Sequence, residues 1–345
     1  MSMMHASQVT SANATIVPPT AHLMRWVIVA TLPGIATMSY FFGLGVLSNV
    51  MLAAAFGLGL EAAILKLRNR PVRITLNDSS ALLTGVLLGV SLPPASPWWL
   101  IGVGMIAAII VAKQLYGGLG HNPFNPAMVG YALLLVSFPT YMTLWAPPQQ
   151  LLPTGLWAQI TGTLPAGQLD SLSGATPLDA FKHKGEAVLA SEFWATHPLP
   201  ESTLSAWRWV ALAWLAGGVL LLAKRIISWH IPAAMLGSLV VLATLFYLSD
   251  PSHFASPLFH LLTGATLFGA FFIATDPVSA ATSRRGKLLY GAGIGTLVII
   301  IRTFGGYPDA VAFAVLLMNL CVPLLDLYSV PRPTGQPKSS RGEQP

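Results

Sequence analysis

Charged side chains are scarce in this chain of 345 residues, and their scarcity excludes a soluble domain. Asp, Glu, Lys and Arg together make up 9% of the residues, hydrophobic residues make up 54%, and the mean hydropathy is +0.66. Soluble domains normally carry about 25% charged residues. The composition therefore predicts an integral membrane protein.

Cysteine is almost missing as well, which limits the cofactors that the chain can hold by itself. Its one cysteine is Cys321. A single thiol excludes an internal disulfide, a Cys-ligated iron–sulfur cluster and a Cys-based zinc site supplied by this chain alone. Cys321 lies in an apolar run, where we expect a small buried residue. The histidines show no ligand spacing, so no mononuclear metal site is expected.

Acidic residues are fewer than basic ones, 12 against 18, which gives a net charge of +6 and a pI of about 9.6. The basic residues gather at the ends of apolar runs, in 66–73, 224–225, 284–287 and 332–341, and do not form one basic face. Nucleic acid is therefore not an expected partner. Ten membrane crossings with both termini in the cytoplasm would put all four groups inside, as the positive-inside rule asks.

Long apolar runs predict about ten membrane-spanning helices, at about 20 residues for each crossing. The segment Met1–Thr20 lacks the features of a cleaved secretory signal, so the first helix is expected to stay as an anchor. The helices are expected at 23–43, 46–65, 80–93, 97–115, 126–146, 206–223, 231–248, 258–275, 287–304 and 308–328.

These helices divide the chain into five parts. Two five-helix repeats, 23–146 and 206–328, enclose a long polar loop, 147–205, in which acidic residues outnumber basic ones. The same count of crossings places this loop in the periplasm. A cytoplasmic N-terminus, 1–22, precedes the repeats. The cytoplasmic tail, 329–345, is too poor in apolar residues to pack and is expected to be disordered.

A short internal match supports the two repeats. The sequence Leu-Leu-Thr-Gly occurs at 82–85 and again at 261–264, each time at the start of a glycine-bearing apolar run that stops near a proline. An odd number of helices in each copy makes the copies inverted. Short, Gly- and Pro-interrupted helices in corresponding positions of two halves often mark a substrate or ion site near the middle of the membrane.

The polar loop contains an unusual segment around Thr176. Small residues, Ser173, Gly174 and Ala175, precede the threonine and would let a modifying enzyme approach its hydroxyl. Pro177 follows it and disfavours helical geometry at Thr176. On physical grounds alone such a segment is also typical of an ordinary turn.

The segment 170–176, Asp-x-x-Ser-Gly-Ala-Thr, resembles the signal at which a flavin transferase esterifies FMN through its phosphate to threonine. Four further segments match in the expected order, at 24–27, 117–128, 229–232 and 274–279. With them, nearly the whole chain resembles the family formed by the D subunits of Rnf ion-translocating oxidoreductases. It more distantly resembles the B subunits of sodium-translocating NADH:quinone reductases.

The resemblance implies a bacterial inner-membrane subunit that holds FMN by a phosphoester to Thr176 and passes electrons within a complex that moves cations. It further implies Rnf subunits A, B, C, E and G as partners, membrane lipid around the helices, and a flavin transferase for maturation. No side chain is then required as a catalytic acid, base or nucleophile, because the cofactor carries the redox chemistry. The sequence leaves open whether sodium or protons are moved and whether a second, non-covalent flavin binds between the helices.

Two rival functions fit the same apolar pattern. A stand-alone secondary transporter shares inverted repeats and interrupted helices, but it has no use for a threonine-linked flavin. A structural subunit that only docks partners is the third interpretation. The attachment motif discriminates among them, because an electron carrier needs it and the others do not.

Several polar residues within or near the apolar runs have more than one possible partner or role. Glu61 is either paired with Lys66 at the cytoplasmic surface or a carboxylate of an ion pathway, a role for which Asp276 is also a candidate. Arg302 is expected to point outward and extend toward solvent, with Asp309 or a flavin phosphate as other partners. Asp78 and Asp326 also lie near run ends.

Two glycine-rich segments are ambiguous. The loop 117–126 is either a tight turn or a place where backbone approaches a ligand closely. The run 291–295, Gly-Ala-Gly-Ile-Gly, superficially resembles a dinucleotide-binding motif, but it lacks a preceding strand and a following acidic residue. Close packing of helices through small residues in lipid explains it better.

Overall fold

The computed structural model describes residues 20–148, 174–184, 188–196, 199–307 and 309–329. Nearly all of the predicted N-terminal part, the predicted tail and much of the 147–205 loop, including Asp170 and Ser173, lie outside the described residues. Throughout the described part the regular structure is helical, and the extended pairing is an isolated bridge between Trp145 and Gly174.

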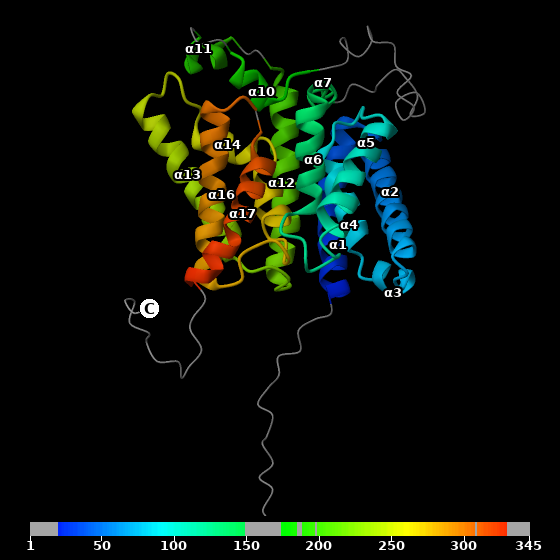
Figure 1. The fold of residues 1–345 in the computed structure, drawn as a ribbon. Coiled ribbons are helices and arrows are strands. Elements are labelled where there is room, and N and C mark those ends of the chain that lie inside the picture. Colours follow the sequence, from blue (N-terminus) through cyan, green and yellow to red (C-terminus); the bar gives the residue numbers. More distant parts are fainter. Residues whose placement is uncertain (1–19, 149–173, 185–187, 197–198, 308, 330–345) are drawn as a thin grey trace, which may run out of the picture.

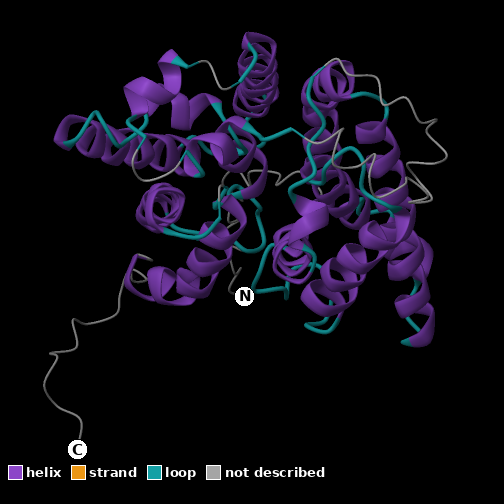
Figure 2. Cartoon of the chain, turned by 90° about the horizontal axis from the view of Figure 1, so that it is seen from above, coloured by secondary structure: helices purple, strands orange, loops and turns teal. Residues whose placement is uncertain are grey.

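The chain forms two groups of helices that lie side by side (Figures 1 and 2). The first group consists of α1 (Thr20–Phe42), α2 (Gly45–Leu67), α3 (Val72–Leu76), α4 (Ser80–Ser91), α5 (Trp98–Met105), the π-helix η1 (Ile106–Gln114), α6 (Pro126–Ser137) and α7 (Pro139–Met142). The second consists of α12 (Glu201–Ala223), α13 (His230–Ser249), α14 (Pro257–Leu262), α15 (Thr266–Phe268), the π-helix η2 (Gly269–Ile273), α16 (Arg284–Phe304) and α17 (Val311–Ser329). Two short helices, α10 (Pro177–Lys182) and α11 (Ala190–Ala195), cover one end of the second group.

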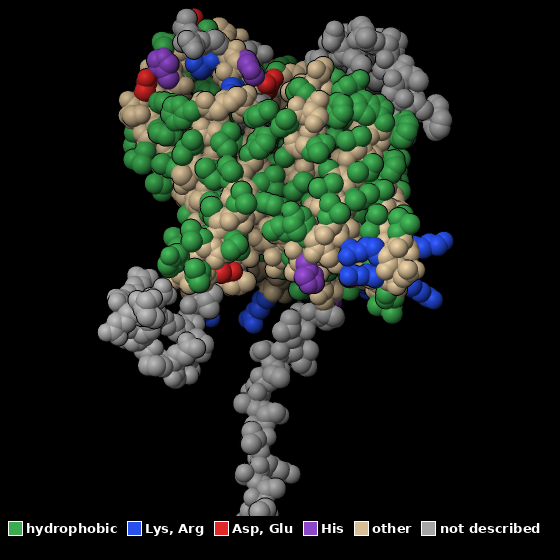
Figure 3. Space-filling view, in the orientation of Figure 1, with side chains coloured by type: hydrophobic (Ala, Val, Ile, Leu, Met, Phe, Trp, Pro, Cys, Tyr) green, Lys and Arg blue, Asp and Glu red, His purple; other side chains and the backbone are tan. Residues whose placement is uncertain are grey.

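Six of these helices, α1, α2, α12, α13, α16 and α17, are long and apolar enough to cross a membrane, and shorter apolar helices lie at 80–91, 98–114 and 126–137. Hydrophobic side chains cover a broad band around the molecule (Figure 3). Helix α1 begins and α17 ends at the end of this band that also contains α3 and a group of basic side chains, whereas α10 and α11 lie at the other end. The fold is that of a multi-pass membrane protein.

Three predicted helices differ from those in the structure. The helix expected at 126–146 ends at Ser137, because Pro139 disfavours helical geometry at Phe138, which has φ −134° and ψ 54°. The helix expected at 258–275 is interrupted after Leu262, and Gly264 adopts a φ of 64° there. The helix expected at 97–115 continues from Trp98 to Gln114, but it changes to π-helix at Ile106.

Small residues let the long helices approach closely. A Cβ atom added at Gly291 of α16 would lie 2.6 Å from the Ile231 carbonyl oxygen of α13, and one added at Gly85 of α4 would lie 2.7 Å from the Ala53 oxygen of α2. Both distances are shorter than van der Waals contact, so a larger side chain would push the helices apart. Gly291 belongs to the 291–295 run, and the interpretation of this run as a helix-packing surface is confirmed.

Gly217 of α12 offers a test of this packing, because its added Cβ atom would overlap the Ala30 carbonyl oxygen of α1 and lie 2.9 Å from the Phe272 ring. We expect Gly217→Ala to cost about 1–3 kcal/mol through overpacking and to lower the melting temperature in detergent. Gly237→Ala in α13 is the matched control, since nothing lies within 4 Å of its added Cβ atom. Equal melting temperatures for the two variants would contradict this account.

Candidate functional site

A cavity of about 320 Å³ lies between the two groups of helices and contains residues of both in its walls. Its size falls within the range of roughly 300–1,000 Å³ that is typical of small-molecule sites. The walls are mainly apolar and aromatic, and they include Met38, Val90, Met128, Leu135, Trp207, Val210, Trp214 and Phe268. Such walls suit a flat, partly apolar ligand.

Thr176 lies at this cavity and is the N-cap residue of α10. Its backbone is extended, with φ −67° and ψ 157°, which confirms the expectation that Pro177 keeps it out of helical geometry. The Thr176 hydroxyl accepts a hydrogen bond of 3.2 Å from the Asp179 backbone amide. The amide of Gly174 donates to the Trp145 carbonyl oxygen at 2.7 Å. The threonine is thus held between the second group and the end of the first.

Helix α10 is fixed by a polar contact with α16. The Lys182 ammonium donates to the Arg302 carbonyl oxygen at 2.9 Å, at the carboxyl end of α16, where a cation is favoured. Partial burial lowers the pKa of Lys182 below its usual value. Asp179 and His183 line the cavity together with Thr176, with His183 Nδ1 3.2 Å from Asp179 Oδ1.

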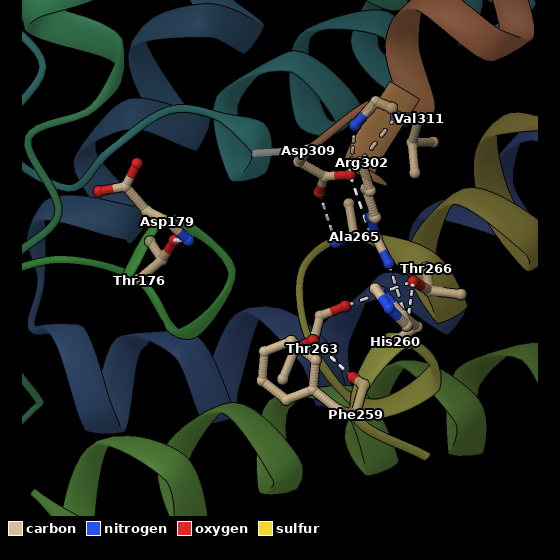
Figure 4. Close-up of polar contacts among 11 residues, drawn as sticks. Thr176, Asp179, Phe259, His260, Thr263, Ala265, Thr266, Arg302, Asp309 and Val311 are labelled. Atoms are coloured by element: carbon tan, nitrogen blue, oxygen red, sulfur yellow. Dashed lines mark hydrogen bonds and ion pairs between the residues drawn. The ribbon is translucent and has the colours of Figure 1, made fainter. Parts of the chain in front are cut away.

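A partly buried ion pair between Arg302 and Asp309 lies in the second group next to the cavity (Figure 4). The Arg302 guanidinium, whose side chain is 1% exposed, donates to Asp309 Oδ1 at 3.0 Å and to the His260 carbonyl oxygen at 2.9 Å. Asp309 Oδ2 accepts a hydrogen bond of 2.7 Å from the amide of Ala265. The hypothesis that Arg302 pairs with Asp309 is confirmed. The expectation that Arg302 extends outward toward solvent is wrong, because the pair and the His260 oxygen hold it inside.

These bonds join the interruption of α14 to the end of α16. Thr266 Oγ1 also donates to the His260 carbonyl oxygen, at 2.7 Å, and Gly264 and Ala265 line the cavity. In Figure 4, Thr176 and Asp179 lie on one side of the view, and Asp309 with Arg302 lies on the other. The cavity therefore has a threonine hydroxyl and a charge-balanced carboxylate on different walls.

A second ion pair, which is buried, corrects the prediction for Glu61. Its carboxylate contacts the Lys113 ammonium at 2.6 Å, with side chains that are 0% and 2% exposed, and accepts a hydrogen bond from Gln114 at 2.7 Å. The expectation that Glu61 pairs with Lys66 is wrong, because η1 brings Lys113 and Gln114 against α2. Lys113 also donates to the Ser80 hydroxyl at 2.7 Å. Lys113, a single charge inside an apolar run, was the signal that sequence reasoning missed.

Each of the remaining polar candidates accepts a hydrogen bond outside the cavity that contains Thr176. Asp276 accepts a hydrogen bond from the Ser279 hydroxyl at 2.6 Å, Asp78 accepts one from the Ser80 amide at 2.7 Å, and Asp326 accepts one from the Thr282 amide at 3.0 Å. None of these three lines the cavity that contains Thr176.

The 117–126 loop is a turn that connects η1 to α6 within the first group and contacts η2 of the second group. Gly117, Gly118 and Gly120 all have positive φ, which the turn requires of its glycines. Asn125 donates to the Ile273 carbonyl oxygen at 3.3 Å.

The prediction that Cys321 is buried is wrong, since its side chain is exposed on α17.

The fold and the site define a polytopic helical membrane protein with a threonine hydroxyl at a cavity between two groups of helices. Residues 9–335 match the model of the NQR2, RnfD, RnfE family, and the chain belongs to this family. It is 53% identical to the D subunit of the ion-translocating oxidoreductase complex of Alcanivorax borkumensis over 337 residues, which are 96% of this chain and 98% of that protein. It is 51% identical to the proteins of the same name from Marinobacter nauticus, covering 97% of both chains, and Escherichia fergusonii, covering 92% and 95%.

Removing one partner of the Arg302–Asp309 pair should destabilise the protein strongly. Asp309→Asn leaves the buried guanidinium without its counter-charge, and breaking a buried ion pair in this way costs about 3–5 kcal/mol. We expect a clear fall in the melting temperature of the purified protein. Glu201→Gln is the control, because Glu201 pairs with Arg208 at an exposed site, at 3.5 Å, and exposed pairs contribute about 0–1 kcal/mol. A melting temperature for Asp309→Asn as high as that of Glu201→Gln would refute the assignment.

Proposed function

We propose that this protein is the membrane subunit of an Rnf-type ion-translocating electron-transport complex, in which Thr176 carries FMN through a phosphoester. The observation that carries the proposal is the position of the Thr176 hydroxyl at a cavity of ligand size between the two groups of helices. Membership of the NQR2, RnfD, RnfE family supports it. The relatives named as complex subunits support an electron-transport role over that of a stand-alone transporter.

The residues present fit FMN. Thr176 would hold the phosphate, and the walls formed by Trp207, Trp214 and Phe268 provide the aromatic and apolar surface that an isoalloxazine ring needs. When bound, FMN supplies the one- and two-electron chemistry that no side chain of this chain offers. The protein's part is to fix the position of the ring, to exclude water through these walls and to set the local electrostatics.

The same proposal includes ten membrane spans in two inverted five-helix repeats. Four interrupted or shorter units would join the six long helices as spans, namely α4, α5 with η1, α6, and α14 with α15 and η2. The interruption between α14 and α15 is flanked by the buried residues Thr263 and Thr266, and the interior of the protein is where a membrane protein tolerates non-helical backbone. The cavity then lies at the boundary between the repeats.

We further propose that the protein lies in the bacterial inner membrane with both termini in the cytoplasm and Thr176 in the periplasm. The basic side chains near α3 lie at the end where α1 begins, and α10 lies at the opposite end. Cytoplasmic loops carry the excess of Lys and Arg. Rnf subunits A, B, C, E and G would surround this protein, and a flavin transferase would modify Thr176 after export of the loop. Electron transfer through the flavin would be coupled to cation movement.

Covalent flavin is the direct test. We expect the fully denatured wild-type protein to give a flavin-fluorescent band on a gel, and the Thr176→Ala protein to give none. Thr143→Ala is the matched control, since Thr143 lines the same cavity but its hydroxyl donates to the Pro139 carbonyl oxygen at 3.1 Å. A dark wild-type band from cells that contain the transferase, or a fluorescent Thr176→Ala band, would rule out the proposal.

Orientation can be tested with single cysteines in a Cys321→Ser background. We expect Ser191→Cys in α11 to react with a membrane-impermeant maleimide in spheroplasts, because α11 lies at the end that contains Thr176. Ile74→Cys in α3, where the native side chain is 76% exposed, should react only after the membrane is opened. The reverse pattern of labelling would overturn the proposed orientation.

A further inference from the structure

Tyr131 brings a hydroxyl group into the wall of the Thr176 cavity. It lies on α6, on the same face as Met128 and Leu135, which also line the cavity at helical spacing. In the part of the chain that the structure describes, the Tyr131 hydroxyl makes no hydrogen bond, although its side chain is half-buried. A polar group in an apolar surrounding is costly unless it is paired, so a ligand that pairs with it is favoured.

The other hydroxyl groups of the wall are placed differently. Ser91 donates to the Leu87 carbonyl oxygen at 2.7 Å and Thr143 donates to the Pro139 oxygen, so both are occupied within their own helices. Tyr307 lies in the segment that follows α16, at the end of the molecule that contains Thr176. Tyr131 lies six residues before Ser137, the last residue of α6, which is about 9 Å along the helix axis at 1.5 Å per residue. Of these two tyrosine hydroxyls, that of Tyr131 lies deeper in the cavity, farther from the end of the molecule that contains Thr176.

Asp309 on another wall does not offer a donor. Its Oδ1 accepts from Arg302, from the amide of Ala310 at 2.8 Å and from the amide of Val311 at 3.4 Å, and its Oδ2 accepts from Ala265. The carboxylate is therefore held in place and balanced by Arg302. Tyr131 can donate a hydrogen bond into the cavity, and Asp309 cannot.

The chemistry of flavin decides what a donor at this depth would do. The ribityl chain separates the phosphate from the ring, so a flavin attached at Thr176 brings its ring, not its phosphate, to the deeper part of the cavity. Reduction adds negative charge to the N1 and C2=O edge of the ring. Hydrogen bonds and charges near this edge tune the potential of the cofactor, and a hydrogen bond is stronger in a surrounding of low dielectric.

We propose that the Tyr131 hydroxyl donates a hydrogen bond to the N1 and C2=O edge of the flavin and thereby raises its reduction potential. This inference rests on the proposed attachment of FMN to Thr176. Thr176 would then hold the flavin, and Tyr131 would contact its ring and set its reduction potential.

The test uses the full-length protein, matured in cells that contain the transferase, and a redox titration of its flavin absorbance. We expect Tyr131→Phe to keep the fluorescent band and to titrate at a more negative potential than wild type. The infrared C2=O band should move to higher frequency, because the carbonyl loses its hydrogen bond. Replacing Tyr131 by 3-fluorotyrosine, a stronger donor of the same shape, should move the potential in the opposite direction.

Tyr290→Phe is the matched control, since the Tyr290 hydroxyl is buried and without a partner among the described residues but does not line this cavity. The reduction potential of the flavin in Tyr290→Phe should equal that in the wild-type protein. A fluorescent Tyr131→Phe protein with unchanged potential and carbonyl frequency would overturn the role of Tyr131 and leave the attachment at Thr176 intact. A shift as large in Tyr290→Phe or in Tyr307→Phe would also overturn it. A dark wild-type band would instead refute the proposed function itself.

Discussion

The Arg302–Asp309 ion pair is the interaction on which the shape of the cavity depends. A membrane-embedded chain can break a helix only where other groups of the protein satisfy the backbone that the break exposes. Here Asp309 accepts a hydrogen bond from the Ala265 amide, and Arg302 donates to the His260 carbonyl oxygen. Each charge would be costly alone in this place, and each is neutralised by the other. The pair therefore allows the interruption at Gly264 to exist inside the molecule.

The interruption at Gly264 matters because it lies beside the cavity that contains Thr176. Gly264 and Ala265 form part of the cavity wall, and the short helix α10, anchored to the end of α16 through Lys182, brings Thr176 to the same cavity. The first group of helices supplies the opposite wall, including Tyr131. A site of this kind needs both groups, so its geometry is set by the packing of α1 on α12 and by the contact between Asn125 and Ile273, more than by any one helix.

The sequence predicts the long helices well, because a run of about 20 apolar residues has few alternatives to a membrane helix. Its proline and glycine also carry the signals for two of the differences: Pro139 explains the early end of α6, and Gly264 explains the interruption after α14. The change to π-helix at Ile106 has no comparable signal. Thr176 was identified through family resemblance, since the local residues alone are also typical of a turn.

Side-chain partners far apart in the chain could not be predicted. One interpretation paired Glu61 with Lys66 in the same helix and the other made it a carboxylate of an ion pathway, but its partner Lys113 comes from another helix. Arg302 and Asp309 are close in sequence, and their pairing was one of the alternatives to the outward orientation that the sequence favoured. The cavity itself depends on how the two groups meet, which hydropathy does not record. Tyr131 is an ordinary residue of an apolar run until the structure shows which surface its helix presents to the cavity.

The claim that the cavity between the two groups of helices holds the flavin attached to Thr176 is tested most directly by an electron cryo-microscopy map of the matured protein within its complex. The account predicts continuous density from the Thr176 hydroxyl oxygen into the cavity, with a planar ring between the walls formed by Trp214 and Tyr131. Density that leaves Thr176 toward solvent, with the cavity filled by side chains or lipid, would contradict it.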